Sequence, residues 1–153
     1  MHLLIRVFLF FFMLCFVPGC KTAGPLTPVD SFIAVQRAIA ANDIKLIGEL
    51  VSKGTKEKVD YFRKTLSTLD KEQLITIAKF YNIDPAKLPG MDFHGALSLY
   101  FSPRSDLSLI KIFNEDISYV DIFGKKAVIR TQSGFEIDFV KEGPYWKLDL
   151  SEL

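Results

Sequence analysis

The sequence predicts an α+β domain in which N-terminal helices pack on a curved antiparallel β-meander of three to five strands. Between residues 28 and 81, apolar side chains recur every three or four positions, which is the period of an amphipathic helix. From residue 117 onward the period is two, and the apolar stretches are β-branched or aromatic and separated by glycine-containing turns. Helices first and hairpins afterwards are typical of the α+β class.

The first helix is expected to begin after Thr27, because a capping threonine, a proline and an acidic residue three positions after the cap form a helix-start pattern. Asn42 and Asp43 interrupt its apolar stripe. A second, short helix is expected to follow this break and to end near Gly54, since glycine commonly ends helices.

The next helix is expected over residues 55–66, with Val59, Phe62 and Leu66 facing the core. Another begins at Asp70, which can cap its own first turn. Its buried face would contain Leu74, Ile77, Ala78 and Tyr81.

The middle of the chain gives a weaker pattern. Asp84-Pro85 predicts a turn or a short helix. Residues 88–105 contain an apolar segment between proline and glycine breakers that fits either a helix or a strand. Leu107–Phe113 is apolar and short, and we expect it to add a strand to the sheet.

The strands are expected over residues 117–123, 127–131, 135–139 and 145–150. Gly124-Lys125, Gln132-Ser-Gly134 and Glu142-Gly-Pro144 supply the turns. In the third strand apolar residues alternate with Glu136 and Asp138, so one face is buried and the other is acidic.

Residues 1–19 have the form of a signal peptide. A short segment with Arg6 precedes an unbroken apolar run from Val7 to Val17, which as a helix is about 16 Å long, roughly half of a bilayer core. A retained anchor formed by residues 3–17 is the alternative, and it would need tilting or a locally thinned bilayer.

The junction Val17-Pro-Gly-Cys20 resembles the lipobox of bacterial lipoproteins, with proline at a position that is usually small or aliphatic. The resemblance implies that Cys20 is acylated with diacylglycerol and fatty acid (palmitate), and that residues 20–29 tether a domain formed by residues 30–153. Several acyl chains make a durable membrane anchor. Lys21 follows the cysteine, so by analogy with enteric bacteria the outer membrane is favoured over the inner one and the domain lies in the periplasm.

Charge and cysteine content narrow the function classes. Arg6 is the only charged residue before Cys20, so the remaining chain carries equal numbers of acidic and basic residues. A neutral domain has no overall electrostatic footprint for nucleic acid or for an anionic membrane. Cys15 and Cys20 are the only cysteines, which leaves the mature domain without an internal disulfide or a cysteine-based metal site, and we expect no cofactor.

Two stretches of the chain resemble the nuclear-transport-factor-like superfamily, which includes ketosteroid isomerases and small bacterial envelope domains of unknown function. One is residues 32–51, with its helix, Asn-Asp break and second helix. The other is residues 117–150, which end in the phrase Gly-Pro-Tyr-Trp-Lys-Leu-Asp-Leu. The resemblance implies a sheet partly wrapped around helices. Because the superfamily is functionally mixed, it implies no particular activity.

The residues suitable for catalysis are few. His94 is the only histidine after the signal, and beside Asp92 it could act as a general base, although a solvated loop histidine is the simpler interpretation. An isomerase- or hydrolase-like site would need Asp121 inside the cone between sheet and helices, on the face of Ile117, Tyr119 and Phe123. A tyrosine from the helices would complete it, the candidates being Tyr61, Tyr81 and Tyr100.

A binding function is favoured over catalysis. One form is a pocket for a small apolar ligand lined by Phe62, Tyr81, Tyr119, Asp121 and Trp146, although large rings such as Phe80, Phe135 and Phe139 also simply fill cores. The other is a surface for an envelope protein on the acidic sheet face, where Glu136 and Asp138 neighbour Lys126 and Arg130. The sequence therefore predicts a lipid-anchored envelope lipoprotein with a non-catalytic binding domain, with the small enzyme as its alternative.

Overall fold

The computed structural model describes residues 24–103 and 109–152. The predicted signal peptide, the lipobox, Cys20 and the first part of the tether lie outside these residues. Within the described part of the chain, no helix is long and apolar enough to cross a membrane.

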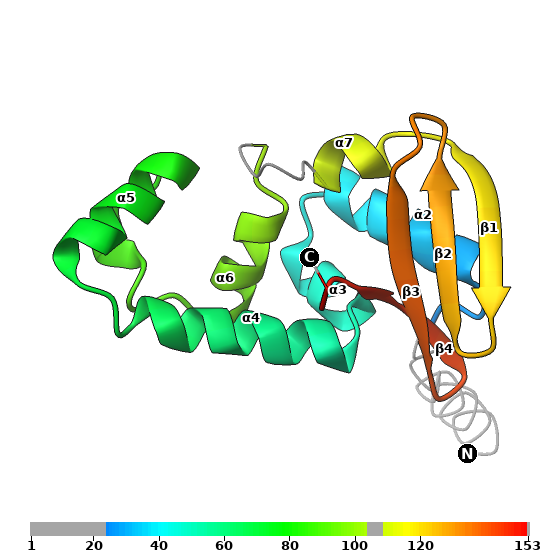
Figure 1. Ribbon diagram of the computed structural model, residues 1–153, viewed down its shortest axis with the longest axis horizontal. Coiled ribbons are helices and arrows are strands. Elements are labelled where there is room, and N and C mark those ends of the chain that lie inside the picture. Colours follow the sequence, from blue (N-terminus) through cyan, green and yellow to red (C-terminus); the bar gives the residue numbers. More distant parts are fainter. Residues whose placement is uncertain (1–23, 104–108, 153) are drawn as a thin grey trace, which may run out of the picture.

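Helices precede strands, and the predicted α+β class is confirmed (Figure 1). The helical elements are α2 (Pro28–Ala40), α3 (Ile44–Leu50), α4 (Lys53–Leu66), α5 (Lys71–Tyr81), the 3-10 helix η1 (Pro85–Lys87), α6 (Phe93–Tyr100) and α7 (Leu109–Phe113). The strands are β1 (Ile117–Phe123), β2 (Lys126–Thr131), β3 (Glu136–Glu142) and β4 (Tyr145–Asp149).

The four strands form one antiparallel meander in the order β1-β2-β3-β4, as the turn spacing predicts. Two tight turns at the same end of the sheet use glycine in the left-handed region, with φ of 64° at Gly124 between β1 and β2 and 60° at Gly143 between β3 and β4. The register is regular except in β1, where it shifts between Ile117 and Tyr119.

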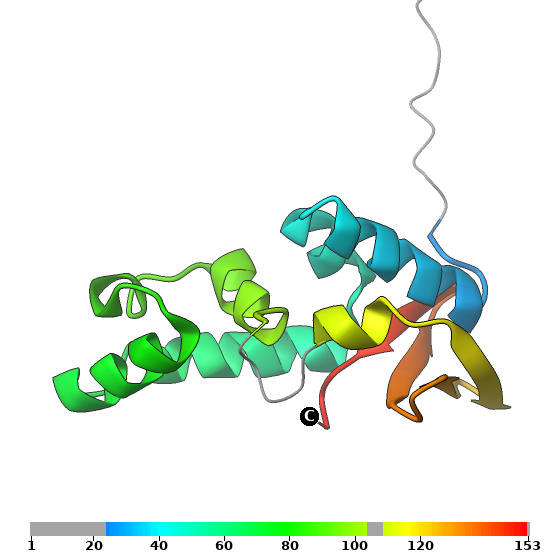
Figure 2. The same ribbon diagram turned by 90° about the horizontal axis from the view of Figure 1, so that it is seen from above.

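One face of the sheet packs on helices. Figure 2 shows α2 and α7 lying across this inner face. Phe32 of α2 and Phe113 of α7 are in ring contact, with centroids 4.8 Å apart, and both belong to a core that includes Ile129, Phe139 and Trp146 of the sheet. The alternation of the strands places these side chains together on the inner face and leaves the outer face to solvent.

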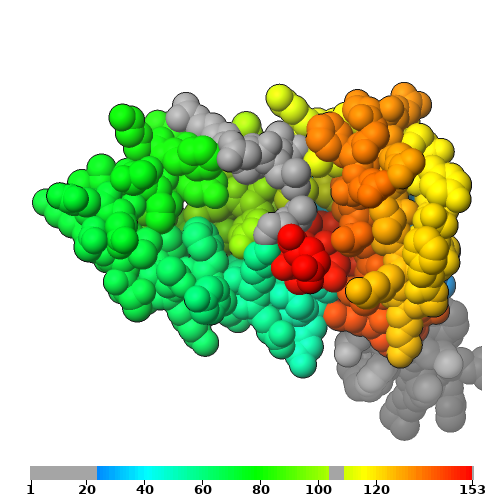
Figure 3. Space-filling model, in the orientation of Figure 1, coloured from blue at the N-terminus to red at the C-terminus, as the bar shows by residue number. Residues whose placement is uncertain are grey.

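A helical arm extends from the sheet to one side, and Figure 3 views it together with the outer face of the sheet. The arm consists of α5, η1, α6 and the second half of α4, and it has a hydrophobic cluster of its own around Leu66, Ala78, Leu88 and Leu99. Helix α4 connects the two clusters. Val59 is buried in the main core and Leu66 in the arm, while Phe62 between them packs against both.

Helix starts agree with the capping residues of the sequence. Thr27 and Asp30 form a capping box at α2, and Asp70 forms one at α5. The expected helix end near Gly54 is wrong. Helix α3 ends at Leu50, and Ser52 caps a new helix by accepting a hydrogen bond from the Thr55 N–H.

Gly54 thus lies in the first turn of α4 and has a packing role there. A Cβ at this position would lie 3.3 Å from Cβ of Ser151, so the missing side chain lets the C-terminal segment approach the helix.

The expected strand over Leu107–Phe113 is also wrong. Residues 109–113 form helix α7, and the first part of the expected strand lies outside the described residues. The Gln36 side chain donates a hydrogen bond of 2.7 Å to the carbonyl of Phe113 at the end of α7. Leu109, Ile112 and Phe113 are buried on a helical spacing, which a seven-residue apolar stretch does not distinguish from a strand.

Candidate functional site

The two edges of the sheet differ sharply. Strand β4 is covered along most of its length, because Trp146 N–H donates to the carbonyl of Pro25 at 2.9 Å and Ser52 N–H donates to the carbonyl of Leu148 at 2.8 Å. Val51 forms a parallel bridge with Leu148, and Leu150 N–H donates to the Thr55 hydroxyl at 2.7 Å. The backbone of this edge is therefore satisfied by the tether and by the α3–α4 connection.

Strand β1 forms the opposite edge, and this edge is open. Within the described residues, β1 has no backbone hydrogen bond besides its ladder with β2. The hydroxyl of Ser118, near the start of β1, donates hydrogen bonds to the carbonyls of Arg130 and Thr131 on β2. From Tyr119 to Phe123 the pairing with β2 is regular, so the outward backbone groups of this stretch are available to another strand.

Large apolar side chains are exposed along the same strand. Tyr119 is 57% exposed, Ile122 55% and Phe123 64%. Tyr119, Asp121 and Phe123 pair with Arg130, Val128 and Lys126, which places them on the outer face. Ile122 pairs with the buried Ala127 and so belongs to the inner side, beyond the part that the helices cover.

Charged residues on the outer face form a network across the strands. Arg130 is ion-paired with its cross-strand partner Glu136. Asp138 lies opposite Asp149, and lost solvation, followed by the negative charge of Asp149, raises the pKa of Asp138. Lys126 on β2 opposes this shift. The acidic face predicted around Glu136 and Asp138 is thus a mixed surface, on which Glu136 is ion-paired with Arg130 and Asp138 is influenced by the charge of Lys126.

Lys147 of β4 has a structural role. Its ammonium donates a hydrogen bond of 2.6 Å to the carbonyl of Glu49 at the C-terminal end of α3, where a cation complements the helix dipole. Burial, followed by the charge of Lys56, lowers the pKa of Lys147.

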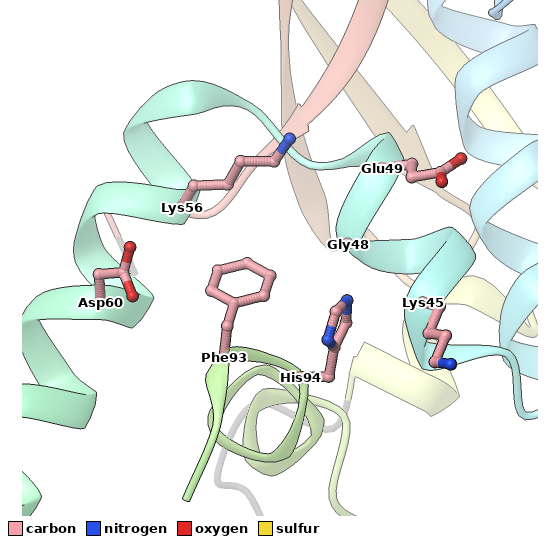
Figure 4. Close-up of a pocket in the computed structure, with 7 residues that line it drawn as sticks. All are labelled: Lys45, Gly48, Glu49, Lys56, Asp60, Phe93 and His94. Carbon is pink, nitrogen blue, oxygen red and sulfur yellow. The ribbon is translucent and has the colours of Figure 1, made fainter.

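A shallow groove of about 430 Å³ lies where α3, α4 and α6 meet, and Figure 4 shows the residues that line it. Phe93 and His94 project from α6 toward α3, where Gly48 leaves room for them. A Cβ on Gly48 would lie 3.2 Å from Nε2 of His94, so glycine is needed for this close approach. Lys45 and Glu49 of α3 and Lys56 and Asp60 of α4 complete the lining.

The groove does not assemble the His94–Asp92 pair considered from the sequence. The Asp92 carboxylate caps α6 by accepting the Gly95 N–H at 2.7 Å. His94 contacts the ring of Phe93 edge-on at 5.3 Å, and within the described residues its imidazole has no hydrogen-bond partner. In Figure 4 the charged side chains of Lys45 and Glu49 point away from the imidazole.

The structure does not bring the five predicted ligand-binding residues together. Phe62 and Tyr81 pack in the helical arm and Trp146 fills the main core. Tyr119 and Asp121 lie on the outer face of the sheet, on the side away from the helices. The rings of Phe139 and Trp146 are buried in the core, whereas Phe80 and Phe135 are exposed.

The expected convergence of Asp121 with a helix tyrosine is not found. The register irregularity at the start of β1 changes which face each side chain occupies, so Val120 rather than Asp121 faces the core. Tyr61 is 74% exposed on α4. Tyr100 lies in the arm against Phe62, where burial, followed by the charge of Tyr81, raises its pKa.

Comparison with protein-family models, with curated proteins and with solved structures found no match for this chain. The open β1 edge therefore has to be interpreted from its own chemistry. Sequence reasoning placed β1 correctly but missed its exposure, because strand order and the cover over β4 depend on contacts between distant residues. The composition of β1 is the sequence signal that could have indicated this exposure. Its residues Tyr119, Ile122 and Phe123 are large and apolar and do not follow one alternating face.

Proposed function

We propose that this protein is a lipid-anchored envelope lipoprotein whose domain binds an extended segment of another envelope protein along the free edge of β1. The observation that carries the proposal is the asymmetry of the sheet, in which β4 is covered and β1 is bare. Addition of a strand to such an edge provides affinity through backbone hydrogen bonds and specificity through alternate side chains.

The composition of β1 supports this function. Proteins that must keep an edge strand unpaired usually place lysine or proline on it. Strand β1 has neither, and its single charged residue is Asp121. The irregular start of the strand protects only Ile117 and Ser118, so five residues from Tyr119 onward remain suitable for pairing.

A second copy of this chain is a poorer occupant than a different protein. Antiparallel self-pairing centred on Asp121 would align the regular stretch completely, but the two Asp121 carboxylates would then be directly opposite, which is unfavourable. Centring on Val120 would place the irregular start of each strand against the end of the other. Centring on Ile122 would align only the last residues of the strands.

The same geometry defines the chemistry of the partner segment. On the outer face it should carry a lysine or arginine opposite Asp121, with an apolar side chain beside it to cover Tyr119. The anchor predicted at Cys20 would hold the domain at the membrane, where a bound envelope protein would be retained.

Photo-crosslinking in cells tests the proposal. p-Benzoylphenylalanine is introduced in place of Tyr119 in the full chain, and in place of Tyr61 as a control, since both are exposed tyrosines. We expect one discrete adduct with another polypeptide from position 119 and none from position 61. The change Ile122→Lys should abolish the adduct by charging the edge, whereas Ile75→Lys on α5 should leave it unchanged.

Two results would contradict the proposal. Equal adducts from both positions would show that the crosslinks are nonspecific. An adduct with the mass of two copies of this chain would instead assign β1 to self-association. Membrane release of Cys20→Ser separately tests the anchor, and a variant that stays on the membrane would support the retained helix.

A further inference from the structure

The tether and the β1–β2 turn lie in one row at the same end of the sheet. Pro25 accepts the Trp146 N–H, Trp146 pairs with Lys141 of β3, and Lys141 N–H donates to the carbonyl of Lys125 at 2.7 Å. Neighbouring strands are about 4.8 Å apart, so roughly 14 Å separates the tether from the turn. Figure 1 shows both at the end of the sheet where the described chain begins.

The described part of the tether is held tightly on this end. A Cβ on Gly24 would lie 2.8 Å from Cγ of Tyr145, so the glycine backbone lies directly on the tyrosine ring. Only four residue steps separate Gly24 from Cys20, and an extended chain of this length spans at most about 14 Å. A lipid on Cys20 would therefore keep this end of the sheet close to the bilayer surface.

The side chains at this end suit a membrane surface. Phe123 is 64% exposed at the end of β1 and pairs with Lys126, and Lys125, Lys126 and Lys141 at the same end of the sheet are also exposed. We call these four residues the hairpin tip. An exposed aromatic ring with lysines at the same end of a domain is a pattern of proteins that rest on anionic headgroups, where each lysine contributes about 1 kcal/mol.

The charges of the sheet are separated along its strands. The opposite end carries Glu115, Asp116 and Glu136, and the cation there, Arg130, is ion-paired with Glu136. At the end of the sheet that carries the hairpin tip, the Glu142 carboxylate accepts a hydrogen bond of 2.7 Å from the backbone N–H of Lys53. The near-zero net charge of the domain conceals this separation.

We propose that the hairpin tip is a membrane-contact site, with the ring of Phe123 among lipid headgroups and the lysines on lipid phosphates. This inference rests on the proposed lipid anchor, which brings the tip within reach. With the tip on the bilayer, β1 runs away from the membrane and its free edge faces the periplasm, where an envelope protein can reach it.

Depth-dependent quenching tests the inference on the full chain, purified from membranes and reconstituted in phosphatidylethanolamine–phosphatidylglycerol vesicles. The variant Lys125→Cys carries an environment-sensitive fluorophore at the tip, and Lys71→Cys carries it at the start of α5 as a control. We expect doxyl-labelled lipids to remove most of the fluorescence at position 125 and none at position 71. Lys141→Glu should reduce the quenching at position 125, and so should neutral phosphatidylcholine vesicles.

The outcomes separate this inference from the anchor. A protein that floats with the vesicles but whose label at position 125 is unquenched would overturn the tip as a contact site and leave the anchor intact. Equal quenching at positions 71 and 125 would also overturn it, since the helical arm would then lie on the membrane. A protein that does not float, and whose Cys20 thiol also takes up the label, would overturn the anchor and the tip together.

Discussion

The hydroxyl of Ser52 lies 2.8 Å from the Asp149 carboxylate, and this hydrogen bond joins the start of α4 to the end of β4. Ser52 is 1% exposed and also caps the helix by accepting the Thr55 N–H. Thr55 extends the network by accepting the N–H of Leu150. The start of α4, the helix that leads into the helical arm, is thus attached to the sheet by polar contacts.

Ser52→Ala should therefore destabilise the protein strongly for a change of one atom. The variant loses the helix cap, and the Asp149 carboxylate loses a buried hydrogen-bond donor. We expect the free energy of unfolding to fall by about 2 kcal/mol. Ser67→Ala at the other end of α4 is the matched control, because Ser67 is exposed and its hydroxyl donates to the carbonyl of Lys64 in the same helix. Urea unfolding measures both variants. Equal small effects would show that the network does not hold the arm.

Much of this fold could be predicted from local patterns. Caps such as Thr27 and Asp70 mark helix starts because their side chains satisfy N–H groups a few residues away, and turn glycines mark the hairpins in the same local way. Gly54 is a different case, because a local cap, Ser52, begins α4 just before it and outweighs the tendency of glycine to end helices. Helix α7 could not be predicted locally, because its end is bound by the distant side chain of Gln36. Neighbouring sequence does not encode such contacts.

The candidate site was less accessible to sequence reasoning for the same reason. Asp121 was expected to face inward because strict alternation was assumed from Ile117, but the register shift before Tyr119 breaks that alternation. The contrast between the two edges could not be predicted, because β4 is covered by Pro25 and Ser52, which are distant from it in the sequence. The lysines of the hairpin tip come from the β1–β2 turn, from β2 and from β3, and Lys141 is distant in the sequence from the other two.

Asp138 should make stability pH-dependent. Its folded pKa is raised, so its contribution to stability is fully present below its unfolded pKa and is lost as the pH rises through the folded value. Asp138→Asn should thus stabilise the protein at neutral pH by a few tenths of a kcal/mol, as is usual for screened surface charges, and the gain should vanish in acid. Thermal unfolding across this pH range measures it, with the exposed Asp116→Asn as control. A gain that persists in acid would contradict an electrostatic origin.

Gly48 should be coupled energetically to His94. Alanine in a helix interior normally gains about 1 kcal/mol over glycine, but a Cβ here would lie 3.2 Å from the imidazole, so Gly48→Ala should gain less or lose stability. In the His94→Ala background part of the gain should return, while the contact of 3.3 Å with Cε1 of Phe93 remains. A double-mutant cycle measured by urea unfolding tests this, and Gly90→Ala, which has open space around it, should give the same effect in both backgrounds. Additive effects of Gly48→Ala and His94→Ala would refute the packing argument.

The contact between Gly24 and Tyr145 should decide whether the tether stays on the sheet. Gly24→Ala places a methyl group 2.8 Å from Cγ of the ring, and the tether must move away to relieve the clash. The hydrogen bond from Trp146 N–H to Pro25 would then weaken, and because such a bond contributes about 1 kcal/mol, the Trp146 amide should exchange with solvent roughly fivefold faster. Hydrogen exchange measured by NMR gives this rate directly, while the amide of Phe139 in the core should keep its protection. If Trp146 exchanges as slowly in the variant as in the original protein, the tether does not hold this edge, and the membrane-facing orientation of the hairpin tip loses the contact that fixes it.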